Sequence, residues 1–249
     1  MSNKYAAYGA ELQVGTPQVE TATVVVTTVT AGNANFTLTA SGMTGSGVAT
    51  VVALAGGETA SQVATKAAAA LNLDSDITAF FTVTTNGPDI VCTRKAAAAN
   101  DATMNLAYAD DTSGGLTDDL TSTDTTAGVA PVEIAGVTSF GGPGLALDTE
   151  DVTTHDQTAA WEELVGTVLR SGEITCDIVY DPADATHDAT TGLNYRLKNK
   201  TYSYFNFIFR STNNWTFFGY VTGFEPTVAV DSFLGASVTI KITGAPTLE

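Results

Sequence analysis

The stretch from residue 201 to residue 222, TYSYFNFIFRSTNNWTFFGYVT, decides the fold of this chain. Every second residue from Phe205 to Phe209 is phenylalanine, the spacing of side chains on one face of a β-strand. The polar segment Ser211–Asn214 then predicts a hairpin turn, and a second aromatic strand begins at Trp215. We therefore interpret these aromatic residues as the core of a β-sheet rather than as a ligand-binding groove.

Similar strand patterns lie on both sides of this hairpin. The strands predicted in this part of the chain are Val132–Val137, Ile174–Tyr180, Thr201–Arg210, Trp215–Thr222 and Ser237–Thr243. One helix is predicted near Thr158–Val165, because Trp161, Leu164, Val165 and Val168 form an apolar stripe at helical spacing. The fold class is therefore mainly β, with one short helix.

Residues 18–129 follow a different pattern and predict a small inserted α+β domain. Thr59 and Gln62 form a capping box before a helix that runs through Asn72. Asn86-Gly87-Pro88 predicts a hairpin. The strands predicted here are Ala22–Val29, Asn35–Ala40, Val48–Leu54, Phe80–Thr85, Asp89–Arg94 and Asn105–Tyr108.

The predicted boundaries of the insertion lie at Gly15-Thr16-Pro17 and in the polar stretch Asp110–Gly128, which is typical of a linker or long loop. Residues 1–17 and 130–249 then form one discontinuous β domain around the insertion.

The charge of the chain argues against binding nucleic acid. Among 249 residues, 27 are acidic and 10 basic, giving a net charge of −17. A protein that wraps nucleic acid needs Lys and Arg to displace counterions from the phosphates. The acidic surface is equally compatible with solubility alone. Only 15% of residues are charged, which suits a protein that covers much of itself with its own copies.

Membrane, redox and secretion signals are not visible in the sequence. There is no apolar stretch of about 18 residues and no signal-peptide pattern, so no membrane partner is predicted. Cys92 and Cys176 are far apart and lie in apolar strand patterns, where buried free thiols are expected. No cofactor is predicted.

No catalytic grouping stands out. Asp181, Asp184, His187 and Asp188 lie close in sequence and could bind a metal ion, but their spacing matches no known zinc or calcium pattern, and a solvated turn is the alternative. Gly141-Gly142-Pro143-Gly144 lacks the Lys-Ser/Thr of a phosphate-binding loop, and we interpret it as a sharp reversal between strands.

An ordered series of segments in residues 1–17 and 130–249 carries a family resemblance. The segments are Tyr8–Gly15, Ile134–Phe140, Gly142–Leu145, Asp148–Thr154, Trp161–Leu164, Ser171–Thr175, Tyr180–Pro182, Phe218–Phe224 and Ser237–Gly244. In this order they resemble the major tail tube protein of siphophages, the lambda-like family. The inserted segment departs from the simple family pattern. Its motif Glu58-Thr59-Ala60-Ser61-Gln62-Val63-Ala64 resembles that of a small α+β module of other phage virion proteins.

The resemblance implies a structural virion protein and not an enzyme. It implies a β-sandwich or barrel whose copies form hexameric rings that stack into a hollow tube, through which double-stranded DNA passes without specific binding. It also implies a location in the virion tail, assembly in the host cytoplasm, and tape measure, tail terminator and distal tail proteins as partners. The insertion would lie on the outer tube surface, because in the lumen it would block DNA. The alternatives are a surface carbohydrate-binding or adhesion module, and a hydrolase with a site in the acidic loops.

One segment, Gly141–Asp156, is predicted to contact the neighbouring ring. Leu145 and Leu147 alternate with small residues and would bury apolar area in a groove of a partner subunit. The nearby acids would meet a basic cluster of that subunit. The predicted inter-ring residues are Leu145, Leu147, Asp148, Glu150, Asp151, Arg196, Lys198 and Lys200.

Overall fold

The computed structural model describes residues 9–110, 112–116, 122–155, 161–210, 213–228 and 233–248. The chain divides into two compact units. Unit 1 consists of Met1–Val14 and Pro131–Glu249, and unit 2 consists of Gly15–Ala130. Antiparallel sheets make up most of both units, so the mainly β prediction is confirmed. No helix in the described ranges is long and apolar enough to cross a membrane.

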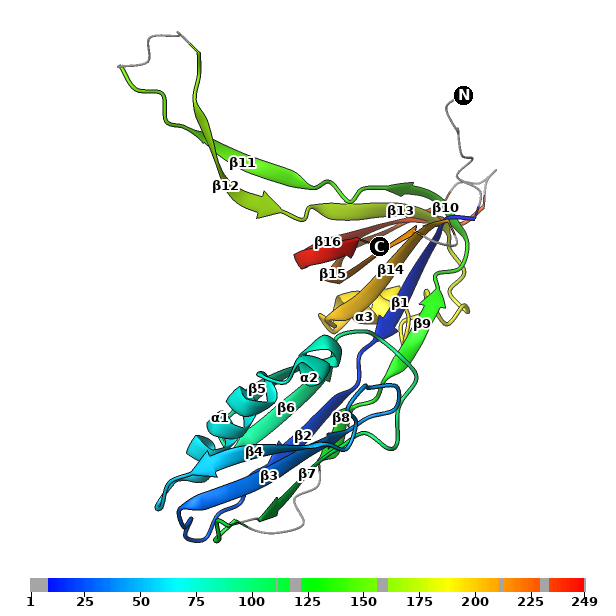
Figure 1. Cartoon of the computed structure of the whole chain (residues 1–249). Helices are drawn as coiled ribbons and strands as arrows, with labels where there is room; N and C mark the ends of the chain where they lie inside the picture. Colours follow the sequence, from blue (N-terminus) through cyan, green and yellow to red (C-terminus); the bar gives the residue numbers. More distant parts are fainter. Residues whose placement is uncertain are drawn as a thin grey trace. The chain divides into compact units, whose positions relative to one another are not determined.

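Unit 1 is built on a seven-stranded sheet with the order β10-β13-β16-β15-β14-β1-β9 (Figure 1). Its strands are β1 Glu11–Thr16, β9 Val129–Glu133, β10 Val137–Gly141, β13 Glu173–Val179, β14 Ser203–Arg210, β15 Asn213–Thr227 and β16 Gly235–Leu248. The aromatic hairpin predicted from the sequence is confirmed as β14 and β15, with Phe205 opposite Phe217 and Phe207 opposite Trp215.

The seven-stranded sheet curls back on itself. Its two edge strands, β9 and β10, are joined by only Ile134–Gly136. A flat sheet would place the edges about 29 Å apart, from six spacings of about 4.8 Å. The chain from Glu133 to Val137 spans at most about 14 Å. The sheet must therefore bend over, and accordingly the Phe140 ring of β10 lies 5.0 Å from the Phe207 ring of β14.

The concave face of this sheet holds the core of unit 1. Along β13 the buried residues are Ile174, Cys176 and Ile178, and the residues between them are exposed. This alternation is what a strand with one solvated face requires. The short helix α3, Leu193–Lys198, contributes the fully buried Leu193 to the same core.

The helix predicted near Thr158–Val165 is wrong. Residues 161–163 are not helical, and Leu164 begins strand β12, Leu164–Arg170; residues 158–160 lie outside the described ranges. The apolar stripe was misleading because an apolar stripe predicts a helix only when it packs against a core. Every residue of β12 is exposed, so Leu164, Val165 and Val168 pack against no core of the described chain. The short helix of unit 1 is α3 instead.

Two predicted strands are placed wrongly. Val132–Val137 covers the end of β9, a turn at Gly136 with φ 66°, and the start of β10. The strand predicted at Ala22–Val29 is shorter and earlier: β2 spans Val19–Thr23, and Val26 forms only an isolated bridge to Leu116.

Unit 2 contains two sheets, with the orders β5-β6-β2-β8 and β4-β3-β7. Besides β2, its strands are β3 Gly32–Thr39, β4 Ala49–Leu54, β5 Phe81–Asn86, β6 Asp89–Arg94, β7 Asn105–Asp110 and β8 Thr123–Thr126. The β5–β6 hairpin turns at Gly87, which has φ 62°, as the Asn-Gly pattern predicts. Strand β8 lies within the stretch predicted to be a loop.

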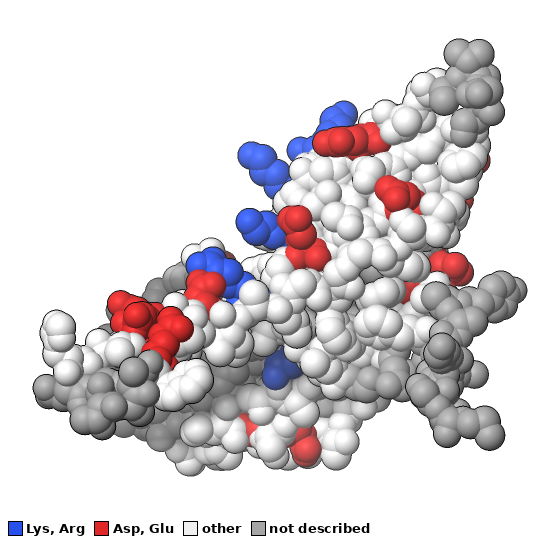
Figure 2. Space-filling view, turned by 90° about the horizontal axis from the view of Figure 1, so that it is seen from above, with Lys and Arg blue, Asp and Glu red and all other residues white. Residues whose placement is uncertain are grey.

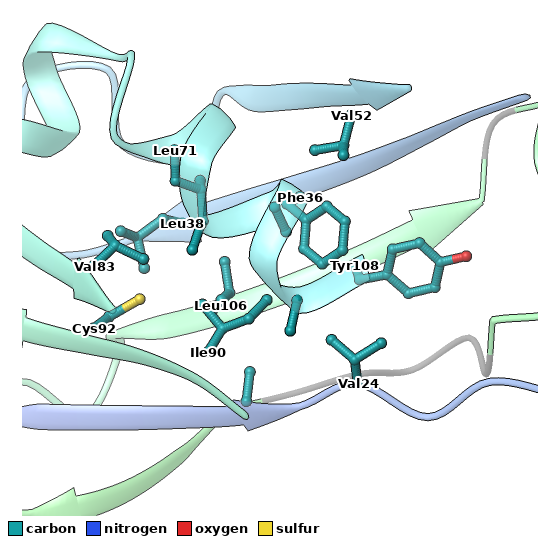
Figure 3. Close-up of a cluster of buried hydrophobic side chains, with 14 of the residues drawn as sticks. Val24, Phe36, Leu38, Val52, Leu71, Val83, Ile90, Cys92, Leu106 and Tyr108 are labelled. Atoms are coloured by element: carbon teal, nitrogen blue, oxygen red, sulfur yellow. The ribbon is translucent and has the colours of Figure 1, made fainter. Parts of the chain in front are cut away.

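Two helices of unit 2, α1 Ala60–Leu71 and α2 Ser75–Phe80, close its core. Helix α1 presents five buried residues, among them Val63 and Leu71, to the strands, and Figure 3 shows Leu71 near Leu38 and Val83. The rings of Phe36 and Tyr108 lie 5.2 Å apart in the same core. Helix α1 confirms the sequence prediction, whereas α2 was not predicted because it is only six residues long.

The capping box of α1 makes a first testable contribution to stability. The Thr59 side chain accepts a hydrogen bond from the Gln62 backbone, and the Gln62 side chain accepts one from the Thr59 N–H at 2.9 Å. Replacing Thr59 by Ala should lower the free energy of unfolding by about 0.5–2 kcal/mol. Thr65→Ala, on the exposed side of the same helix, is the matched control and should cause no loss. Urea unfolding measures both; equal stability of the two variants would show that the cap contributes nothing.

Candidate assembly surface

A two-stranded element extends the β10–β13 ladder of unit 1 (Figure 1). Strand β11, Ala146–Asp151, pairs antiparallel with β12, Leu164–Arg170. We call β11 and β12 together the arm. Gly141 lies opposite Thr175 and Ala146 lies opposite Arg170, so one register runs through both ladders with a short break. The predicted reversal at Gly141–Gly144 is therefore wrong, because the chain continues forward from β10 into β11.

Glycines allow the two chains to approach closely at the base of the arm. A Cβ on Gly172, where φ is +69°, would lie 2.4 Å from the carbonyl oxygen of Gly144. A Cβ on Gly142, where φ is +96°, would lie 2.3 Å from the carbonyl oxygen of Glu173. Both positions need glycine for conformation and for space. The break between the ladders is thus encoded in the sequence as the point where the arm leaves the sheet.

The arm is exposed on both faces. Pairing places Leu147 opposite Leu169, and the Leu147 side chain covers Gly166, where a Cβ would lie 3.0 Å from its Cδ2. Leu147 remains 54% exposed and Leu169 82%. An isolated two-stranded hairpin is marginally stable in water. Large apolar side chains on such an element indicate a surface that another molecule covers.

The opposite face of the arm is charged. Arg170 donates from Nε and Nη2 to Oδ2 of Asp148, at 2.7 and 2.5 Å. The hydrogen bond from Arg170 lowers the pKa of Asp148, and the same bond raises the pKa of Arg170. The two strands of the arm have three acidic residues, Asp148, Glu150 and Asp151, and one arginine. The arm therefore keeps a net negative charge even with this ion pair formed.

An open apolar groove lies where the arm meets the end of β16. It has a volume of about 500 Å³. Its lining residues are Leu145, Leu169, Arg170, Ser171, Gly244, Ala245, Pro246 and Leu248. Leu145, a predicted contact residue, thus lines the groove together with the C-terminal part of β16. The sequence did not predict that β16 contributes to this surface. Arg170 was also missed, although it is the only lysine or arginine between residues 141 and 170 and could have been noticed for that reason.

The predicted basic cluster is only partly exposed. Lys198 and Lys200 are exposed, but Arg196 is buried at 8% exposure and donates from Nη1 to the Ser203 hydroxyl at 2.8 Å. Burial lowers the pKa of Arg196. Arg196 therefore packs helix α3 onto the sheet and is not presented to a partner, which corrects the sequence prediction for this residue.

The acidic loop after β13 is a structural turn. His187 is 1% exposed; its Nδ1 accepts from the Asp181 N–H at 3.2 Å and its Nε2 donates to the Ala135 carbonyl at 2.8 Å. The carboxylates of Asp184 and Asp188 accept hydrogen bonds within the same loop, which hold the pKa of each below its usual range. Across the described ranges, no group of three or more His, Cys, Asp or Glu side chains is placed to hold a metal ion.

The two cysteines lie apart in the cores of the two units. Burial raises the pKa of Cys92 and of Cys176 to about 12, with a smaller effect from Glu20 on Cys92 and from Asp177 on Cys176. The reactive thiolate is thus disfavoured at both positions. This places them as core residues, as the sequence predicted.

Comparisons with known proteins give structural likenesses at low identity. No family model and no curated protein matches the chain. The tail of an empty gene transfer agent particle, refined with C6 symmetry, is similar over 48% of this chain and 86% of that chain, with 18% identity and a TM-score of 0.39. A chain of the virion of a native gene transfer agent particle is similar over 48% and 88%, with 17% identity and a TM-score of 0.39. A chain of the anti-feeding prophage baseplate is similar over 48% and 83%, with 9% identity and a TM-score of 0.37.

Proposed function

We propose that this chain is a structural, non-enzymatic virion protein, the major tail tube subunit of a siphophage. In this proposal six copies form a ring, and the rings stack into a hollow tube through which double-stranded DNA passes during ejection. The observation that carries the proposal is the arm, whose strands expose leucine and valine side chains on a surface that no part of the described chain covers. The ordered sequence resemblance to the tail tube family supports the same role.

The arm is a suitable element for contacts between copies. Leu145 is 48% exposed and Leu147 is 54% exposed. Covering the half of each side chain that remains exposed would contribute about 0.7–1.5 kcal/mol, repeated at every subunit of a ring. A contact in which the arm of one copy binds a different surface of the next copy is heterologous. Such contacts generate rings or open filaments, which is what a stacked tube requires.

The charge and the surface of the chain suit a conduit for DNA. The net charge of −17 disfavours adhesion of the DNA phosphates to the subunit. The space-filling view shows a face on which uncharged residues predominate, with acidic side chains lying among the basic ones (Figure 2). Unit 2 would lie on the outside of the tube, because a unit of this size in the lumen would obstruct DNA. Tape measure, tail terminator and distal tail proteins are the other expected partners.

Electron microscopy of the purified full chain tests the proposal directly. At high protein concentration we expect rings or tubes, and light scattering should report species much larger than a monomer. A protein that stays monomeric in every condition and binds glycans would overturn the proposal in favour of a carbohydrate-binding module. The amount of assembled protein in these samples should not depend strongly on added divalent metal, since no metal site is part of the proposal.

A further inference from the structure

An aromatic patch lies on the outer face of the unit 1 sheet. The Tyr202 ring stacks on the Phe218 ring with centroids 5.0 Å apart, and lies 5.4 Å from the Tyr220 ring. Tyr204 packs edge-on to Phe218 at 5.5 Å. Phe217 and Val221, the alternate residues of β15, belong to the core on the other face. The aromatic patch, defined as Tyr202, Tyr204, Phe218 and Tyr220, is therefore not part of that core.

The patch is incompletely covered in the single chain. Tyr202 is 47% exposed and Tyr220 is 41% exposed. Tyrosine side chains bury large apolar area at low conformational cost, and aromatic residues are concentrated at the energetically important centres of protein interfaces. Tyr204 is buried at 8% exposure and supports the cluster, so the two exposed tyrosine rings held against Phe218 indicate an interface.

Lysine side chains border the aromatic patch. Lys241 of β16 lies directly opposite Tyr220, and both are exposed on the outer face. Lys200 lies two residues before Tyr202 and is exposed. Within the described ranges neither lysine forms an ion pair, although Glu173 lies opposite Lys241 on the neighbouring strand β13. Two of the chain's few basic residues therefore lie at the border of the patch.

The arm has the complementary character. Glu150 and Asp151 are exposed, and Asp151 lies opposite Leu164 in the β11–β12 ladder. Each of these acidic residues thus lies opposite an exposed apolar residue of β12. The aromatic patch offers the reverse combination, an apolar centre with a basic border. Opposite potentials across an interface fix its register and exclude wrong partners.

We infer that the aromatic patch, with Lys200 and Lys241, receives the arm of a second copy of this chain. This inference rests on the proposed self-assembly and names the two surfaces that meet. The arm does not cover the patch of its own chain, since Tyr202, Tyr220, Glu150 and Val165 are all exposed in the single subunit. Leu147, Leu164 and Leu169, which share one face of the arm, would lie on the rings. Asp151, on the same face of β11, would lie beside the lysines, with Glu150 next to it in the chain.

A charge-reversal cycle in the full chain tests this contact. Lys200→Glu with Lys241→Glu places like charges beside the incoming arm, which should raise the protein concentration needed for assembly by more than about tenfold. Glu150→Lys with Asp151→Lys should have the same effect from the other side. The quadruple variant has the charge of the original chain and should restore assembly, because the opposite charges again face each other.

Several outcomes separate the inference from the proposed function. Circular dichroism and size-exclusion chromatography at low concentration establish that each variant is folded. If the original chain forms tubes and the double lysine variant forms them equally well, the receptor surface is wrong while the tube proposal stands. Folded double variants that fail to assemble, with no recovery in the quadruple variant, would also overturn the inference. If the original chain never assembles, the proposed function itself fails.

Discussion

Replacing Leu145 and Leu147 together by Asp is expected to leave folded subunits or single rings and to abolish long tubes. Leu145 lines the groove at the base of the arm, and Leu147 lies on the leucine face of the arm. The double change removes about 0.7–1.5 kcal/mol of apolar burial per residue at the contact and adds two charges that must lose water there. Both effects recur at each copy around a ring. Negative-stain electron microscopy at matched concentration counts tubes and rings.

The expected loss belongs to assembly and not to folding. Neither leucine is in the buried core of unit 1, so the double variant should unfold at nearly the same urea concentration as the original chain. Asp148→Asn is the matched control on the same strand. It removes the ion pair with Arg170 within the arm, and it should leave tubes that are less sensitive to salt. Normal tubes from the double leucine variant would show that the arm is not a stacking element.

The elements that could be predicted from sequence are those with a local cause. The aromatic alternation around Phe205 specifies a strand because side-chain direction has a period of two. The capping residues at Thr59 and Gln62 specify where α1 begins, because they satisfy backbone donors that the first turn leaves open. The Asn86-Gly87 turn likewise depends only on its own backbone conformation.

The elements that could not be predicted depend on distant partners. Leu164 and Val165 have a spacing that suits a helix, and the strand they form is decided by pairing with β11 and not by their own order. Arg196 is basic and was expected at the surface, but its long side chain reaches Ser203 inside the fold. The groove beside Leu145 includes Pro246, about one hundred residues away, and no local pattern indicates that proximity.

The aromatic patch illustrates the same limit at the candidate interface. Sequence alone assigns all the rings of this region to one core. In the structure Phe205 and Phe217 lie inside, whereas Tyr202 and Tyr220 lie on the outer face. Successive residues of a strand point to opposite faces, so the register decides which rings lie inside and which lie on the outer face. Without the register, the exposed tyrosines could not be separated from the buried phenylalanines.

Removal of unit 2 is expected to leave a soluble unit 1 that still polymerises. The chain leaves unit 1 after Val14 and returns at Pro131, and strands β1 and β9 are neighbours in the seven-stranded sheet. Adjacent strands lie about 4.8 Å apart, so a short Gly/Ser linker can span the gap between Thr16 and Ala130. Ile134 N–H donates a backbone hydrogen bond of 2.8 Å to the Leu12 carbonyl. This bond lies away from the new connection and keeps β1 and β9 paired.

The stability of the shortened chain depends on unit 1 alone, because each unit has its own buried core. The core of unit 1 contains Leu12, Phe205 and Ile240, and that of unit 2 contains Phe36, Leu71 and Ile90, with no residue in common. We therefore expect a cooperative unfolding transition and tubes of smaller outer diameter, measured by denaturation and electron microscopy. The matched control is the same shortened chain with Leu145→Asp and Leu147→Asp added. It should fold without forming tubes. If the shortened chain is folded and soluble yet never assembles, unit 2 belongs to the interface and its proposed place on the outside of the tube is wrong.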